Sequence, residues 1–158
     1  MKNNVKLAQE AVELVKPAID KLFEIAKRKE LHIVVMDPTI KPWECDFADA
    51  ILYQETIGNP EQWPVKFDDL ARNKAAQAWR NSSANINMHT AHPSSIRDDD
   101  CLFYGSFVYG DIVVGCSGIE SHFDMLISAW IALAFEQLAI HSYEKDKADT
   151  PMKPLRVC

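Results

Sequence analysis

The chain has 158 residues, of which 47% are hydrophobic and 25% are charged, and its formal net charge is −6 at pH 7. This length and balance are typical of one globular domain that is large enough to bury its own core. The acidic charge, with no stripe of lysines and arginines, argues against nucleic-acid binding.

The sequence also argues against a membrane or secreted protein. No run of about 18 apolar residues predicts a membrane span, and the amino terminus lacks the apolar segment of a signal peptide. The four cysteines are spread along the chain without a C-x-x-C pair, which favours reduced thiols. We therefore expect a cytoplasmic protein with no membrane partner, in which Cys116 is a buried, inert thiol.

The first half of the chain alternates between helical and extended patterns. Apolar residues at steps of three and four over residues 4–29 predict an amphipathic helix. A β-branched run at residues 31–36 and a second run near residues 50–56 predict two strands. The connections within residues 39–64 are rich in turns, prolines and tryptophans and could border a ligand site. A second helix is expected over residues 66–80.

The second half predicts a hairpin followed by a long helix. Two strands are expected at residues 101–108 and 111–116, and the closing helix runs from about residue 122 to 143. Residues 146–158 are polar and contain prolines, so they predict a loose tail after a single domain formed by residues 1–145. Hairpin-linked strands between helices favour an antiparallel sheet covered by helices, which is an α+β domain.

Lys74 is the first candidate for a functional residue. It falls on the apolar face of the helix over 66–80, where a lysine must reach solvent, pair with a carboxylate or meet a ligand anion. A structural pair with Asp124 or Asp37 and a contact with a ligand are both open on this pattern.

The turn between the last strand and the last helix is the second candidate. Gly115-Cys-Ser-Gly118 precedes a helix amino terminus, where backbone N–H groups and the helix dipole favour an anion. Ser117 could donate a hydrogen bond to a carboxylate, and glycines permit a close backbone approach. The alternative is a tight turn that holds no ligand.

His122 and Asp124 are candidates for acid–base chemistry beside this turn. His122 could exchange protons or ligate haem iron, and Asp124 could cap the helix, pair with Lys74 or act as a general base. His89 and His92 have no third ligand at a recognisable spacing, so no protein-bound metal is expected.

Several short motifs together resemble the GlcG/HbpS-like (DUF336) family. They are the Ala71-Arg-Asn-Lys-Ala75 helix segment, the Val113-Val-Gly-Cys-Ser-Gly118 strand end and Asp124 six residues later, and the resemblance covers roughly residues 5–140. It implies a profilin-like fold with α/β/α layers, in which helices cover both faces of an antiparallel sheet of about five strands. It also implies a homo-oligomer. Some relatives bind haem, and others accompany glycolate use or aromatic-ring catabolism.

The resemblance and the residues together predict a protein that binds a small carboxylated metabolite in organic-acid or aromatic catabolism. The ligand-binding positions are Lys74, Gly115, Ser117 and Gly118, with apolar walls from Trp43, Trp63 or Trp79. If the protein is an enzyme, tautomerisation or hydrolysis is expected, with His122 and Asp124 as the catalytic residues. Haem binding and a structural oligomeric module without catalysis are the two alternatives.

Overall fold

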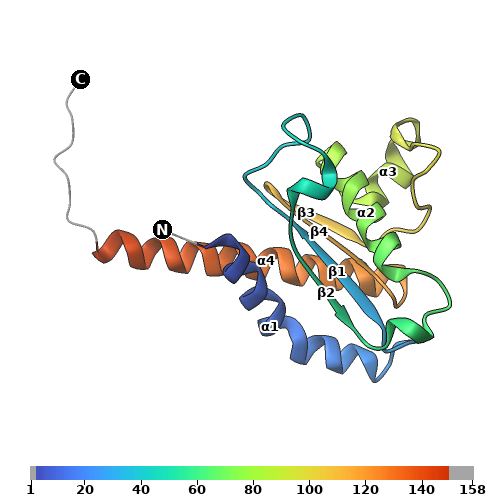
Figure 1. The fold of residues 1–158 in the computed structure, drawn as a ribbon, viewed down its shortest axis with the longest axis horizontal. Coiled ribbons are helices and arrows are strands. Elements are labelled where there is room, and N and C mark those ends of the chain that lie inside the picture. The colour runs from blue at the N-terminus through green and yellow to red at the C-terminus, as the bar shows by residue number, and fades with distance from the viewer. Residues whose placement is uncertain (1–2, 150–158) are drawn as a thin grey trace.

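The computed structural model describes residues 3–149, which form one four-stranded antiparallel sheet with helices on both faces (Figure 1). The strand order is β2-β1-β4-β3. The strands are β1 (Leu31–Met36), β2 (Ile51–Ile57), β3 (Ser106–Tyr109) and β4 (Ile112–Ser117). The helices are α1 (Asn4–Phe23), α2 (Phe67–Asn81), α3 (Asn85–Ala91) and α4 (Ser121–Asp149).

Strand alternation divides the core between the two faces of the sheet. In β1, Leu31, Ile33 and Val35 pack in a core shared with α1 and α4, whereas Val34 and Met36 pack with α2. Every residue of β4 is buried as well. Because both central strands bury both faces, helices must cover the sheet on each side, and the expected α/β/α layering is confirmed.

The observed elements differ from the expected ones in three places. The family resemblance implies about five strands, but the described residues form four, and the segment between α2 and β3 contains the short helix α3. Residues 101–105 form a loop instead of opening the hairpin, and the Cys101 N–H donates to the Asn73 side chain rather than to a strand. α1 ends at Phe23 instead of continuing to residue 29.

The predicted carboxy-terminal boundary is also wrong. The sequence predicts a loose tail from residue 146, but α4 continues through Asp149, and a Lys147–Glu144 ion pair supports this last turn. Residues 150–158, with Cys158, lie outside the described residues. Cys45, Cys101 and Cys116 are free thiols.

α4 is the longest helix, and its carboxy-terminal part extends beyond the sheet (Figure 1). By length and composition it could cross a membrane, but the core helix of a soluble protein has the same properties. Ile127, Ile131 and Phe135 are buried in the core shared with α1 and the sheet. These buried side chains are consistent with α4 being a helix of the protein core.

Gly115 allows α2 to lie directly on β4. A Cβ atom at this position would come within 2.8 Å of the Ala71 carbonyl oxygen, the Ala75 Cβ and the Ala75 backbone nitrogen. No side chain fits in that space without displacing the helix backbone. The glycine therefore sets the distance between α2 and the sheet, and with it the position of every side chain on this face of α2.

Gly115→Ala should lower the free energy of unfolding by about 1–3 kcal/mol, because the added methyl group would overlap the backbone of α2. Urea denaturation monitored by circular dichroism measures the change. Gly110→Asn is the control, since Gly110 has open space around it and a φ of 58° that asparagine tolerates. Unchanged stability in Gly115→Ala would contradict the close packing of α2 on β4.

Candidate functional site

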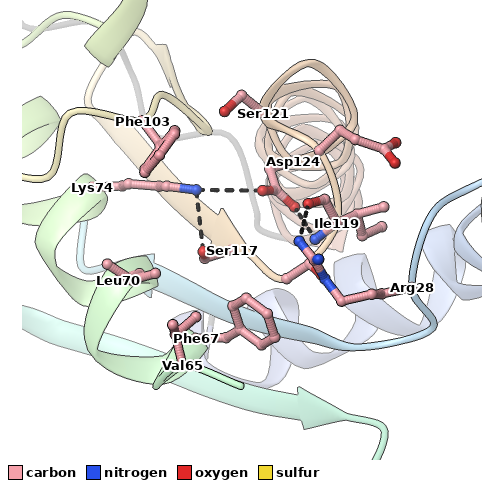
Figure 2. Close-up of a pocket in the computed structure, with 12 residues that line it drawn as sticks. Arg28, Val65, Phe67, Leu70, Lys74, Phe103, Ser117, Ile119, Ser121 and Asp124 are labelled. Carbon is pink, nitrogen blue, oxygen red and sulfur yellow. Dashed lines mark hydrogen bonds and ion pairs between the residues drawn. The ribbon is translucent and has the colours of Figure 1, made fainter. Parts of the chain in front are cut away.

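A cavity of about 280 Å³ lies between α2, the turn after β4 and the first turn of α4 (Figure 2). Its polar lining consists of Arg28, Lys74, Ser117, Glu120, Ser121 and Asp124. Its other lining residues are Val65, Phe67, Leu70, Phe103, Gly118 and Ile119. A mostly apolar cavity with a few convergent polar groups is typical of a small-molecule site.

A buried ion pair between Lys74 and Asp124 lies at the inner end of this lining. The Lys74 Nζ is 3.3 Å from the Asp124 Oδ2, and both side chains are only 3% exposed. The same ammonium donates to the Cys116 carbonyl oxygen at 3.1 Å and to the Ser117 Oγ at 3.2 Å. These three acceptors match the three N–H donors of an ammonium group.

Local sequence explains why these groups meet. Lys74 lies on the face of α2 that packs on the sheet, and strand alternation turns Ser117 to the same face as Val113 and Gly115. Gly105 lies against the pair, because a Cβ atom there would be 2.6 Å from the Cys116 carbonyl oxygen and 2.9 Å from the Lys74 Nζ. The site therefore needs a glycine at this position to accommodate the lysine.

Asp124 stands in the first turn of α4 and caps the turn that precedes the helix. Its Oδ1 accepts the Ile119 N–H at 3.2 Å. Burial raises the pKa of Asp124 above the usual aspartate value, while the Lys74 charge and the backbone N–H groups oppose that increase. A carboxyl group held in this way can both accept and release a proton, which is the property of an acid–base residue.

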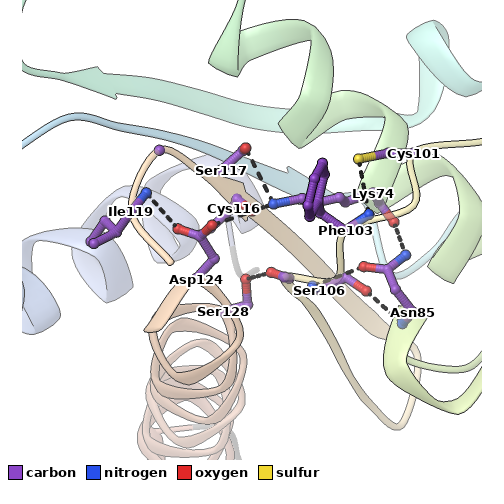
Figure 3. Close-up of polar contacts among 12 residues, drawn as sticks. Lys74, Asn85, Cys101, Phe103, Ser106, Cys116, Ser117, Ile119, Asp124 and Ser128 are labelled. Carbon is purple, nitrogen blue, oxygen red and sulfur yellow. Dashed lines mark hydrogen bonds and ion pairs between the residues drawn. The ribbon is translucent and has the colours of Figure 1, made fainter. Parts of the chain in front are cut away.

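A second buried polar network holds the other end of Lys74 (Figure 3). The Asn85 side-chain amide donates to the Lys74 carbonyl oxygen at 2.9 Å, and its Oδ1 accepts the Ser106 N–H at 3.0 Å. The Ser128 hydroxyl donates to the Gly105 carbonyl oxygen at 2.6 Å. These bonds tie α2, α3, β3 and α4 together around the ion pair.

Arg28 closes the opposite end of the cavity. Its Nε donates to the Gly118 carbonyl oxygen and its Nη2 to the Ile119 carbonyl oxygen, both at 2.9 Å. The guanidinium carbon lies 5.2 Å from the centre of the Phe67 ring, within range of a cation–π contact. Gly118 itself has a φ of 148° and lies close to the Glu30 backbone, so a side chain would not fit there.

The structure brings together four of the six predicted site residues. Lys74, Ser117, Gly118 and Asp124 all line the cavity. Gly115 does not, because it lies beneath α2. His122 also lies outside the cavity lining: its side chain is 62% exposed, its ring lies 4.4 Å from the ring of Phe123 at a tilted angle, and its Nε2 lies 4.0 Å from the Glu120 carboxylate.

The three tryptophans proposed as cavity walls lie elsewhere. Trp43 is 81% exposed, Trp63 donates its ring N–H to Glu30, and Trp79 packs in the core beneath α2. Val65, Phe67, Leu70 and Phe103 form the apolar walls instead. Only Trp63 comes near this region, through its ring contact with Phe67.

Sequence reasoning missed Arg28, Gly105 and Asn85. Arg28 follows α1 in a run of charged residues, so its pattern resembles that of a solvent-exposed side chain. Gly105 and Asn85 belong to segments without periodicity. Their only signal was chemical type, a glycine just before β3 and an amide at the start of α3, and chemical type does not reveal partners elsewhere in the chain.

Cys116 is buried next to the site but faces the opposite core. Its predicted burial is confirmed, and burial raises the pKa of its thiol to about 12, which disfavours the reactive thiolate. The residues that the structure describes contain no cluster of three or more His, Cys, Asp or Glu suited to a metal ion. None of the cavity-lining residues is a His, Met, Cys or Tyr, so the lining does not fit axial ligation of haem iron.

Comparison with known proteins supports the fold and leaves the activity open. No family model and no curated protein matches the chain. Among solved structures, the chain is similar to the Klebsiella pneumoniae protein ORFY, which is described as a DUF336 protein. The TM-score is 0.51 at 17% identity, over 80% of this chain and 88% of that chain. The predicted profilin-like α+β fold is thus confirmed.

Lys74→Met should lower the free energy of unfolding by about 3–5 kcal/mol, because it leaves the Asp124 carboxylate buried without its counter-charge. The double variant Lys74→Met/Asp124→Asn should lose clearly less than the sum of the two single variants, since no charge remains buried. Urea denaturation of all four proteins gives this coupling energy.

Lys147→Met is the matched control, because Lys147 also pairs with a carboxylate but both partners are exposed. Its effect should stay within about 0.5 kcal/mol. Additive effects of the two cavity substitutions would contradict a strong interaction between Lys74 and Asp124.

Proposed function

We propose that this chain is a GlcG-like (DUF336) protein whose cavity binds a small carboxylated molecule and moves a proton on it. The observation that carries the proposal is the buried Lys74–Asp124 pair in the lining of a cavity with apolar walls. A charged pair withdrawn from water is expensive, and functional sites are the usual places where a fold retains one.

The chemistry that this pair supports best is tautomerisation. The Asp124 carboxylate can remove a proton from a carbon next to a carbonyl group, and the positive charge of the Lys74 ammonium, without a free N–H donor, can stabilise the negative charge that develops on the nearby oxygen. The proton then returns to another atom of the same molecule. No further reactant is required, because the number of atoms and electrons does not change.

Hydrolysis with Ser117 as nucleophile has less support. The Ser117 Oγ accepts a hydrogen bond from the Lys74 Nζ, as in a serine–lysine pair. A lysine that activates a serine must be neutral, however, and the Asp124 carboxylate and the Cys116 carbonyl oxygen both favour the ammonium form of Lys74.

We further propose that the protein acts in the cytoplasm as a homo-oligomer. The free thiols among the described residues suit a reducing compartment. On α4, Leu126, Leu133 and Ile140 are partly exposed at seven-residue spacing, which is the pattern of a seam between helices. Beside α4, Trp130 lines an apolar groove with Pro17, Leu22 and Ile25, whose apolar surface a second copy could cover.

Thermal-shift measurements with glycolate, benzoate, phenylpyruvate, cis,cis-muconate and hemin test the proposed ligand class. At least one of the acids should raise the melting temperature, since a ligand at 100 times its dissociation constant stabilises a protein by about 2.7 kcal/mol. A protein stabilised by hemin alone, or by nothing in the panel, would contradict the proposal of a carboxylate site.

Exchange of the phenylpyruvate C3 protons in D₂O, followed by proton NMR, tests the proposed chemistry. The wild-type protein should accelerate the exchange over buffer, and Asp124→Asn should reduce this acceleration by about 10²–10⁴-fold. Asp20→Asn, at an exposed position of α1, is the control and should exchange at the wild-type rate. Equal rates for Asp124→Asn and wild type would exclude Asp124 as the base.

Leu133→Asp should shift the protein to a smaller assembly in light scattering coupled to size-exclusion chromatography. A charge at the centre of the α4 seam would have to be buried between two copies, whereas the isolated chain leaves this position partly exposed. Leu102→Asp, at an exposed position before β3, should leave the mass unchanged. A monomeric wild-type protein would contradict the oligomer.

A further inference from the structure

The guanidinium of Arg28 uses only one of its two hydrogen-bonding edges within the protein. Its Nε and Nη2 donate to the Gly118 and Ile119 carbonyl oxygens. Among the residues that the structure describes, no group accepts a hydrogen bond from the Arg28 Nη1. The Nη1–Nη2 edge therefore keeps the two-pronged geometry that binds a carboxylate through two parallel hydrogen bonds.

Arg28 is also held in place before any ligand arrives. The two carbonyl oxygens fix one edge, and the ring of Phe67 lies against the guanidinium (Figure 2). A side chain fixed in this way loses little conformational entropy when it binds an anion. Arg28 lines the cavity and is only partly exposed, so its remaining donors are available within the site.

Lys74 is less suited to anchor the carboxylate. Each of its three N–H donors already has an acceptor, in the Cys116 carbonyl, the Ser117 hydroxyl and Asp124. A ligand carboxylate would have to displace one of these groups. Arg28 can accept the same anion without breaking any hydrogen bond of the protein.

The charges around the cavity favour a ligand with a single carboxylate. The ionisable lining groups are two cations, Arg28 and Lys74, and two anions, Glu120 and Asp124. The Glu120 carboxylate accepts the Lys27 N–H and lies near His122, so this negative charge is at the edge of the cavity. One bound carboxylate can pair with Arg28. A second carboxylate would find only Lys74, which is already paired with Asp124.

We propose that the cavity takes a monocarboxylate with an apolar body, held by the Nη1–Nη2 edge of Arg28 so that its other end reaches Lys74 and Asp124. The apolar body then lies against Phe67, Leu70 and Phe103, which line the same cavity. This assignment rests on the proposed function and adds the substrate class and the residue that selects it.

Isothermal titration calorimetry with phenylpyruvate, its methyl ester and cis,cis-muconate tests the assignment. Wild-type protein should bind phenylpyruvate at least tenfold more tightly than either other compound. Arg28→Gln should weaken phenylpyruvate binding roughly ten- to hundredfold, as expected for a charge-assisted hydrogen bond, and leave the ester within about twofold. Lys29→Gln removes the same charge from an exposed neighbour and should retain the wild-type preference.

Each other outcome overturns the assignment. A preference for the acid that survives in Arg28→Gln would show that another group binds the carboxylate. Equal loss of acid and ester would give Arg28 only a structural role, and tighter binding of muconate would contradict the monocarboxylate. If wild type binds benzoate or glycolate but not phenylpyruvate, this assignment fails while the proposed carboxylate site stands. If wild type binds no acid, both fail.

Discussion

The candidate site depends on one physical constraint, which is that the charges of Lys74 and Asp124 are both removed from water. Two buried charges are tolerated only when their mutual attraction and further hydrogen bonds replace the lost hydration. The lysine has three acceptors and the aspartate receives the N–H of Ile119. The surrounding elements must therefore hold their positions closely, because a small displacement would leave a buried charge without its partner.

Two glycines show how the fold meets this constraint. Gly115 lets α2 approach β4 closely enough for Lys74 to reach the strand end, and Gly105 leaves space beside the ammonium group. The Asn85 side chain then holds the backbone carbonyl of Lys74 and the backbone N–H of Ser106 in place. Lys74, Asp124 and Arg28 line the same cavity, so a ligand that binds Arg28 can reach the buried ion pair.

Most of the fold could be predicted from the sequence, because helices α1 and α2 carry apolar residues at helical spacing and strands β1 and β4 are short, continuous apolar runs. Lys74 and Asp124 were recognised since a charge on an apolar face and a carboxylate at a helix start both leave a local signal. Arg28 and the apolar walls could not be found in this way. Their roles depend on contacts between distant segments, whereas His122 had the right chemical type but points away from the cavity.

The most direct test of this account is an NMR titration of the Asp124 carboxyl carbon, assigned by its absence in Asp124→Asn. We expect a pKa above the usual aspartate value of 3.8, because burial outweighs the Lys74 charge. In that case the folded state binds the proton more tightly than the unfolded state, and this group's contribution to stability falls as the pH rises above 3.8. A pKa at or below 3.8 would contradict this result, since the Lys74 charge and the backbone N–H groups would then outweigh burial at the pair.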